Sequence, residues 1–341
     1  MKRWFVSSTR VKTELDRESG IALLAVLWAV TLLGLVAVAL SNSVQDEVRT
    51  ATYRKEAAQA YGIACGGVEA AILGIVYPPP ANPDTPPFWT WKKGQHEGVV
   101  PFQGGRALLL IENESGKVDL NSADRAQLVR LFEAHGLEVA AAEQLTAAIV
   151  HWREPKNEDD RDAQVLDDFY RRAGIRPRHG LFQSTEEVLN VRGMSREIFY
   201  GSVGISLRGS LFERSGVGQD LTVLSGRSQV NVNYASTYAL QSVPGVGPDL
   251  AEAIVRERNR EPFSSVTEIG DRTAKVLDED SIPYLTTSDG PAYSIVSVGE
   301  IAGSPVRRAV KAVFQIDSQG FPADHLVAWY DDYGISSTGG M

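Results

Sequence analysis

The stretch IALLAVLWAVTLLGLVAVALS occupies residues 21–41 and contains no charged side chain. About 20 such residues, each rising 1.5 Å, cross the ~30 Å hydrocarbon core of a bilayer as one helix. A buried core helix is the alternative, and an uncharged run of this length argues against it. Residues 1–20 form a leader with five basic and three acidic side chains. This basic excess predicts that the leader stays in the cytoplasm and that the residues after the helix are exported.

The composition is that of a folded, acidic protein. The chain has 341 residues, of which 43% are hydrophobic and 23% charged, and this balance excludes wholesale disorder. Its 43 acidic and 34 basic side chains give a net charge of −9, which argues against binding to nucleic-acid phosphates. Cys65 is the single cysteine, so the chain forms no internal disulfide and no metal site built from several cysteines. The length predicts two compact units with appendages.

Two kinds of export signal compete at the N-terminus. An ordinary signal peptide would be cut after Ala37-Val38-Ala39, but its apolar region is usually about 7–15 residues, shorter than the run seen here. The stretch Glu18-Ser19-Gly20-Ile21 instead resembles a class III prepilin signal, which prepilin peptidase cuts after the glycine while the apolar helix is retained. The resemblance implies cleavage between Gly20 and Ile21. Most pilins carry glutamate five residues after the cut, whereas this chain has Ala25, and that absence resembles the minor pseudopilin K of type II secretion.

The segments after the apolar run predict a stalk, a connector and a small sheet domain. Residues 42–77 contain helix formers without proline and continue the helix, and the proline-rich residues 78–91 form a stiff connector. Strand patterns occupy residues 106–111, 292–300 and 305–316, the last two as a hairpin. We therefore expect a sheet domain built from residues 92–117 and 291–320, followed by a tail at 321–341 whose Gly- and Ser-rich end, residues 334–341, is loose.

Residues 118–290 lie between the two parts of the predicted sheet domain and contain a repeat. Val118–Ala123 matches Val230–Ala235 at an offset of 112, and Phe182–Val188 matches Phe263–Ile269 at an offset of 81. The first copy therefore holds 31 extra residues, which we place in an acidic insert near 151–181. Because helical patterning dominates, the predicted fold is α+β: a pilin-like long N-terminal helix packed on a small antiparallel sheet, with a large inserted all-helical domain.

The second copy contains a helix-hairpin-helix motif with the turn Gly245-Val246-Gly247 between its helices. The glycines permit a tight turn, and Pro248 suits the first turn of the next helix. The backbone amides of such a turn can bind a DNA phosphate, or the hairpin can simply pack two helices. From residue 231 to 275, five basic side chains face six acidic ones, which favours packing. A membrane-anchored DNA-binding protein of a competence or DNA-uptake system is the alternative function.

The order of these features resembles the type II secretion minor pseudopilin K over nearly the whole chain, including Val230-Asn231-Val232-Asn233-Tyr234-Ala235 and Pro262-Phe263-Ser264-Ser265. The resemblance implies a single-pass protein of the bacterial inner membrane, with its bulk in the periplasm, that starts pseudopilus assembly at the tip and supports export across the outer membrane. The implied partners are the other minor pseudopilins, the major pseudopilin and prepilin peptidase, without nucleic acid. The five histidines are scattered and match no catalytic motif, so we predict no enzymatic activity.

The resemblance also implies calcium in the inserted domain. A calcium ion needs about six to eight oxygen ligands, and clustered carboxylates would supply them. The candidate ligands are Glu154, Asp159, Asp160, Asp162, Asp167 and Asp168. Asp167 and Asp168 are the strongest candidates, since aromatic residues follow them. In the alternative interpretation, these carboxylates pair with the arginines at 171, 172, 176 and 178, and no ion is bound.

Overall fold

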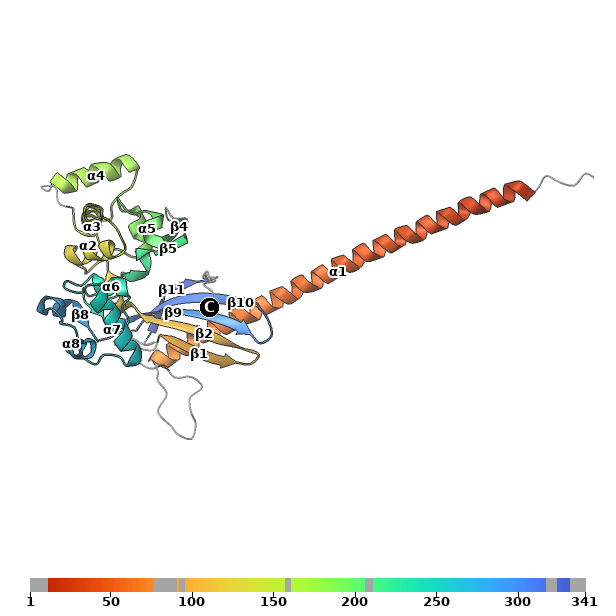
Figure 1. Ribbon diagram of the computed structural model, residues 1–341. Helices are drawn as coiled ribbons and strands as arrows, with labels where there is room; N and C mark the ends of the chain where they lie inside the picture. The colour runs from red at the N-terminus through yellow and green to blue at the C-terminus, as the bar shows by residue number, and fades with distance from the viewer. Residues whose placement is uncertain are drawn as a thin grey trace, which may run out of the picture. The chain divides into compact units, whose positions relative to one another are not determined.

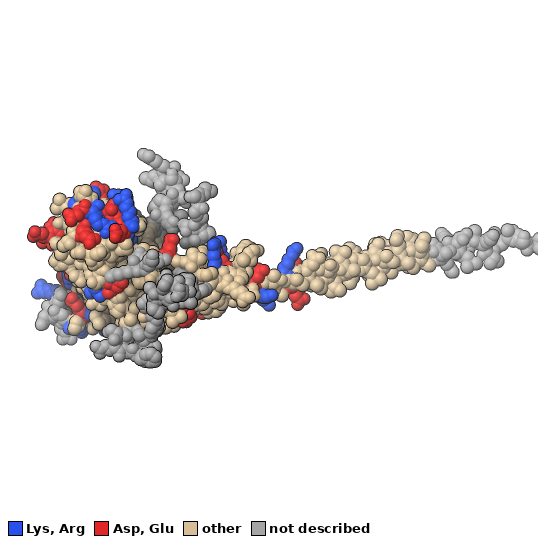
Figure 2. Space-filling view, turned by 90° about the horizontal axis from the view of Figure 1, so that it is seen from below, with Lys and Arg blue, Asp and Glu red and all other residues tan. Residues whose placement is uncertain are grey.

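The computed structural model describes residues 12–76, 91, 96–156, 161–205, 211–316 and 324–331, and it divides into two compact units, residues 1–59 and 60–341. The described residues of the first unit, 12–59, lie in one continuous helix, α1 (Lys12–Val76; Figure 1). Its apolar side chains are exposed, with Trp28 at 74%, and Figure 2 shows this stretch without charge. Among the described helices, α1 is long and apolar enough to cross a membrane, so it could serve as a single-pass anchor.

The second unit contains a five-stranded antiparallel sheet in the order β1-β2-β9-β10-β11. The C-terminal part of α1 packs on this sheet, where Ala64 and Val68 share a core with Ile111 and Phe314. A Cβ at Gly299 would overlap the carbonyl oxygen of Ala60, so glycine is required where helix and sheet approach most closely. The predicted helix-on-sheet α+β fold is thus confirmed. The strands span Glu97–Phe102, Gly105–Asn113, Ala292–Ile301, Arg307–Ile316 and Asp324–Tyr330.

The tail predicted for residues 321–341 is partly wrong, because β11 lies inside it and extends the sheet beyond residue 320. β11 pairs with β10 along the edge of the sheet. Asp331 follows β11 and accepts hydrogen bonds from the Tyr61 hydroxyl (2.7 Å) and from Trp329 Nε1 (2.8 Å). This strand forms because β10 offers it backbone partners, and local periodicity cannot report such a long-range condition.

The inserted domain is mainly helical, and its helices share one continuous core. Buried side chains come from both predicted copies, for example Leu128 and Leu131 from the first and Leu240 and Ile254 from the second. The α-helices are α2 (Arg125–Ala134), α3 (Val139–Arg153), α4 (Arg161–Ala173), α5 (Arg196–Tyr200), α6 (Thr237–Gln241), α7 (Pro248–Arg260) and α8 (Glu268–Thr273). Short 3₁₀ helices are η1 (Glu114–Gly116), η2 (Thr185–Asn190), η3 (Val217–Asp220) and η4 (Glu279–Tyr284).

The expectation of an all-helical insert needs one correction, because three short strand pairs occur in it. β3 and β7 begin the two copies, and each gains a parallel partner that satisfies its backbone before the chain enters a helical hairpin. A third, antiparallel pair joins β4 to β5. The pairs are β3 (Val118–Asp119) with β6 (Leu221–Thr222), β7 (Val230–Asn231) with β8 (Leu285–Thr286), and β4 (Gly201–Ile205) with β5 (Leu211–Ser215).

An asparagine closes each copy at the predicted offsets. In the first copy, the Asn121 side chain donates to the Phe182 carbonyl oxygen (3.1 Å) and accepts from the Phe182 N–H (2.8 Å). In the second copy, Asn233 binds Phe263 in the same two ways, at 2.9 and 2.7 Å. The two halves of each copy are therefore joined by the same pair of hydrogen bonds, which supports the repeat.

An arginine braces the start of each copy by donating to two backbone carbonyl oxygens. Arg153 binds those of Leu120 (2.6 Å) and Ala123 (2.8 Å), and Arg258 binds those of Val232 (3.0 Å) and Ala235. Burial lowers the pKa of Arg258 to about 10.

The positions of Arg153 and Arg258 show where in the first copy the 31 extra residues lie. The offset between Arg153 and Arg258 is 105, which lies between 112 at the start of the copies and 81 at their end. Seven of the 31 extra residues therefore precede Arg153, and 24 lie between Arg153 and Phe182. The longer insertion contains α4, which lacks a counterpart among the described residues of the second copy.

Candidate functional site

The inserted domain leaves the sheet after Asn113 and returns at Gly290, and one buried side chain joins the two points. Asn113 Nδ2 donates to the Gly290 carbonyl oxygen (3.0 Å), and the Gly290 N–H donates to Asn113 Oδ1 (3.0 Å). Asn113 Oδ1 also accepts from the Ser115 N–H (2.9 Å) and so caps η1. The polar backbone groups at this buried junction are therefore satisfied.

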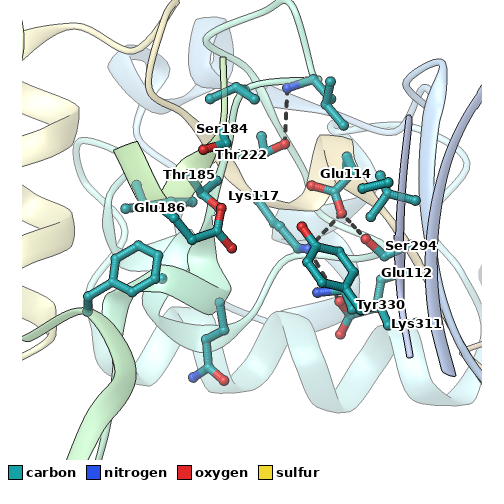
Figure 3. A pocket seen from close by; sticks show the side chains of 18 of the residues that line it. Glu112, Glu114, Lys117, Ser184, Thr185, Glu186, Thr222, Ser294, Lys311 and Tyr330 are labelled. Atoms are coloured by element: carbon teal, nitrogen blue, oxygen red, sulfur yellow. Dashed lines mark hydrogen bonds and ion pairs between the residues drawn. The ribbon is translucent and has the colours of Figure 1, made fainter. Parts of the chain in front are cut away.

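A cavity of about 860 Å³ lies beside this junction, between the sheet and the inserted domain (Figure 3). Three of its charged side chains form ion pairs: Lys117 Nζ lies 2.7 Å from Glu114 Oε1 and 3.5 Å from Glu112 Oε2. Glu114 Oε1 also accepts a hydrogen bond from Ser294 Oγ on β9. The contacts with Ser294 on β9 and with Glu112 on β2 thus fasten the first residues of the inserted domain to the sheet.

The ionisation of this cluster is set by burial and by mutual attraction. Burial alone would raise the pKa of Glu114, but the charge of Lys117 and the hydrogen bonds from Lys117 and Ser294 hold it below its ordinary value. Burial alone would lower the pKa of Lys117, but Glu114 and Glu112 raise it well above its ordinary value. Burial lowers the pKa of nearby Lys311, and the charge of Lys117 adds to that effect. Both pKa shifts therefore favour the charged forms of Glu114 and Lys117.

The helix-hairpin-helix turn is covered by the η4 segment. Gly245 has φ +78°, and a Cβ there would come within 2.7 Å of Ser281 Oγ and 2.9 Å of Asp278 Cβ. Ser281 Oγ donates to the Pro244 carbonyl oxygen (2.6 Å), so η4 is hydrogen-bonded to the turn. The Asp278 carboxylate also lies near this turn, with Oδ2 3.4 Å from the position of such a Cβ. The turn is built for packing, as the local charge predicts.

Val246 and Asp249 also favour packing over phosphate binding. Val246 is buried in the domain core, whereas Gly247 is the N-cap of α7 and has open space around it. Asp249 lies in the first turn of α7, with its side chain 92% exposed, and places negative charge at the helix N-terminus. A carboxylate stabilises the helix dipole there, but it repels a phosphate.

The predicted processing residues lie in α1. Gly20 and Ile21 are consecutive residues of that helix, and Ala25 follows about one turn later. Residues 1–11 of the leader lie outside the described residues, and so does the connector except for Trp91, whose ring meets Tyr293 edge-on at 5.9 Å. Cleavage after Gly20 and the role of Ala25 stay predictions.

The predicted calcium ligands do not gather into one oxygen-rich site among the described residues. Asp159 and Asp160 lie outside the described ranges, Glu154 is the C-cap of α3, and Asp162 lies in the first turn of α4. Asp168 pairs with Arg171, as the salt-bridge interpretation expects.

Asp167 instead faces two histidines, at 2.9 Å from His151 Nε2 and 3.5 Å from His179 Nε2. A set with two imidazoles and one carboxylate does not fit calcium, which requires oxygen. Calcium stays a prediction that depends on the loop outside the described residues. This cluster could not be predicted from the sequence, because the three residues meet only when α4 packs beside the end of α3.

Two family models match parts of the chain. Residues 107–200 match the model described as type II secretion system protein K, and residues 225–274 match the helix-hairpin-helix motif. The first match spans β2, the junction and the first copy, and the second spans the hairpin of the second copy. Over residues 107–200 the chain is similar to the type II secretion protein K family. No curated protein matches the chain.

A solved structure has a similar fold. The chain resembles one chain of the crystal structure of the GspK-GspI-GspJ complex from the enterotoxigenic Escherichia coli type 2 secretion system, with a TM-score of 0.53 and 13% identity. The likeness covers 87% of this chain and all of the other. Family and fold are those of a structural component of a secretion machine, and the DNA-uptake alternative is not favoured.

Proposed function

We propose that this pseudopilin occupies the tip of the type II secretion pseudopilus, starts its assembly and so supports protein export across the outer membrane. The observation that carries the proposal is the protein K module at residues 107–200, set in a fold that resembles a chain of a three-pseudopilin complex. Its partners would be two further minor pseudopilins and, below them, the major pseudopilin. The charge on the surface agrees with protein partners, since Figure 2 shows acidic and basic residues interspersed on the face in view.

Ala25 supports a position at the distal end of the fibre. After cleavage, the ammonium of Ile21 would begin an apolar helix, and an unpaired charge in such surroundings costs several kcal/mol. In pilin-like fibres, a glutamate of the incoming subunit pairs with the ammonium of the subunit above it. Ala25 has no carboxylate and cannot make that pair with a subunit above. The subunit therefore needs only a partner below it, whose glutamate would pair with the Ile21 ammonium. Ala25→Glu should therefore change its stoichiometry or partners, as measured by cross-linking in membranes.

The membrane topology follows from α1. We expect a single-pass protein of the inner membrane, with the leader in the cytoplasm and the second unit in the periplasm. Prepilin peptidase would leave 321 residues that begin at Ile21. Intact mass of the membrane-extracted protein measures this directly, and a mature start at Leu40 would instead indicate an ordinary signal peptide.

A deletion strain tests the proposed function as a whole. Loss of the gene should leave secreted proteins in the periplasm, and the full chain should restore export. A variant with the prepilin cleavage blocked, Gly20→Asp, should fail to restore it while remaining in the membrane. Normal export in the deletion strain would contradict the proposal.

DNA binding is the competing function, and the geometry of the turn argues against it. Asp278 lies against Gly245 and Asp249 lies in the first turn of α7, so the turn has two carboxylates close to it. A gel-shift assay across salt concentrations should therefore show no retardation at physiological salt.

A further inference from the structure

Three side chains from separate segments converge beside α4. His151 comes from the last turn of α3, Asp167 from the middle of α4, and His179 from the segment that follows α4. One ligand atom of each lies within 4.8 Å of the other two. The His151 side chain is 7% exposed, and those of Asp167 and His179 are each 21% exposed, so the cluster is sheltered but reachable by an ion.

The donor chemistry fits a metal ion of the zinc type. Two neutral imidazoles and one carboxylate, with a fourth position open, are a set that Zn²⁺ accepts in proteins. Metal–ligand bonds of about 2.0–2.1 Å place the ligand atoms of a tetrahedral site about 3.3 Å apart. The two distances to Asp167 Oδ1, 2.9 and 3.5 Å, bracket that spacing. A small opening of the cluster would therefore admit the ion.

The backbone around His179 holds this residue beside the other two. Its Nε2 faces the cluster, 3.5 Å from Asp167 Oδ1, and its other ring nitrogen, Nδ1, is buried without a hydrogen-bond partner among the described residues. Its backbone has φ +49°, which is uncommon for a residue other than glycine. The Gly180 N–H donates to the Trp152 carbonyl oxygen (3.2 Å), which holds this segment across α3. Strained backbone of this kind persists where the surroundings fix it, often at ligand sites.

The surrounding side chains hold the first ligand in place. The His151 ring is parallel to the Tyr170 ring, at 2° and 6.1 Å between centroids, and meets the His179 ring edge-on at 5.0 Å. The Tyr170 hydroxyl accepts from the Arg192 N–H (3.0 Å), so this tyrosine is itself anchored. Such fixed neighbours orient a metal-binding imidazole.

We propose that His151, Asp167 and His179 form a three-ligand site for a divalent transition-metal ion such as Zn²⁺. The ion fastens α4 to α3, because its ligands lie on both helices and on the following segment. α4 needs such a fastening: Ala163 and Tyr170 are the buried side chains among its described residues. In the second copy, the offset of 105 puts Arg256 at the place of His151, and Arg256 lies near Glu252 at 3.9 Å. The proposed site therefore belongs to the first copy.

The test uses the full-length chain, purified in detergent and stripped of metal with chelator. Zinc chloride or calcium chloride is then added alone, and bound metal and melting temperature are measured. Zn²⁺ should bind at one ion per chain and raise the melting temperature by mass action. The double variant His151→Gln/His179→Gln should bind Zn²⁺ more than about 100-fold more weakly. His325→Gln, which changes an exposed residue of β11, is the matched control and should bind like the parent.

Two further measurements keep the proposal testable if the double variant folds poorly. Asp167→Asn preserves shape and hydrogen bonding but removes the carboxylate, and it should also weaken Zn²⁺ binding. Co²⁺ bound to the unaltered chain should give the visible spectrum of a four-coordinate nitrogen–oxygen site and be displaced by Zn²⁺. Binding of calcium alone, Zn²⁺ binding that survives the double variant, or a water-like Co²⁺ spectrum would overturn the proposal and leave a hydrogen-bonded cluster.

Discussion

The two helix-hairpin-helix copies are held by the same bonds but differ in what has been added to them. Each copy has an asparagine that joins its start to its end and an arginine that braces two carbonyl oxygens. The first copy has gained α4 and the histidine cluster, and the ion pair of the junction precedes it directly. Bonds from side chains to backbone thus define the repeated scaffold, whereas pairs between side chains distinguish the copies.

The largest expected effect concerns the ion pair, which the second copy lacks because Gly226 and Gln229 stand at the positions of Glu114 and Lys117. Glu114→Ala leaves the buried ammonium of Lys117 without its nearest carboxylate partner. The variant should therefore lower the free energy of unfolding by about 3–5 kcal/mol. Denaturant unfolding of the full chain in detergent, followed by tryptophan fluorescence, measures this.

Glu112→Ala is the matched control for the ion pair, because the Glu112 side chain is 44% exposed, and its loss should cost less than about 1 kcal/mol. The double variant Glu114→Leu/Lys117→Met should recover most of the stability, because it removes both buried charges. Equal losses for Glu112→Ala and Glu114→Ala would show that burial does not decide the energetics of the pair.

The asparagine bonds give the next effect. Asn233→Ala leaves the buried N–H and carbonyl of Phe263 without their hydrogen-bond partner and should lower the free energy of unfolding by about 2–4 kcal/mol. Asn121→Ala changes a half-buried position and should lower it by about 1–2 kcal/mol. The same unfolding measurement, made on both variants, compares the copies. An Asn121 variant that costs more than the Asn233 variant would mean that the first copy carries the stability of the domain.

The arginine braces give a smaller effect, because replacing them also relieves a buried charge. Arg258→Met should lower the free energy of unfolding by about 1–2 kcal/mol and Arg153→Met by about 1 kcal/mol, since each leaves two carbonyl oxygens without their donor. Thermal melts of the two variants can rank them. No loss in either variant would mean that water satisfies these carbonyl oxygens equally well.

The smallest expected effect is a pH dependence of stability that comes from Glu114. The second copy has no carboxylate at the corresponding position, Gly226. The pKa of Glu114 in the folded chain lies below its ordinary value of 4.5, so its stabilisation is complete above that value and is lost as the pH falls below it. The difference in unfolding free energy between the parent and Glu114→Gln should therefore shrink as the pH falls. A difference that grows on acidification would have the wrong sign.

The sequence predicts those parts of the molecule whose signals are local. The apolar run at 21–41, the hairpin of β9 and β10, and the paired motifs Val118–Ala123 and Val230–Ala235 each show their pattern within a short window. β11 cannot be predicted from a local pattern, because it forms by pairing with the free edge of β10. The cluster of His151, Asp167 and His179 cannot be predicted in this way either. Its members are 16 and 12 residues apart in the sequence, and only the packing of α4 on α3 brings them together.

The proposed position at the pseudopilus tip is tested most directly by assembly with the proteins that would lie beside it. The chain would be co-expressed with the GspI-type and GspJ-type pseudopilins of the same cell, and the detergent-extracted material examined by native mass spectrometry. The account predicts a complex that contains one copy of each of the three proteins. A chain that remains alone while the other two associate, or that is recovered bound to DNA, would contradict it.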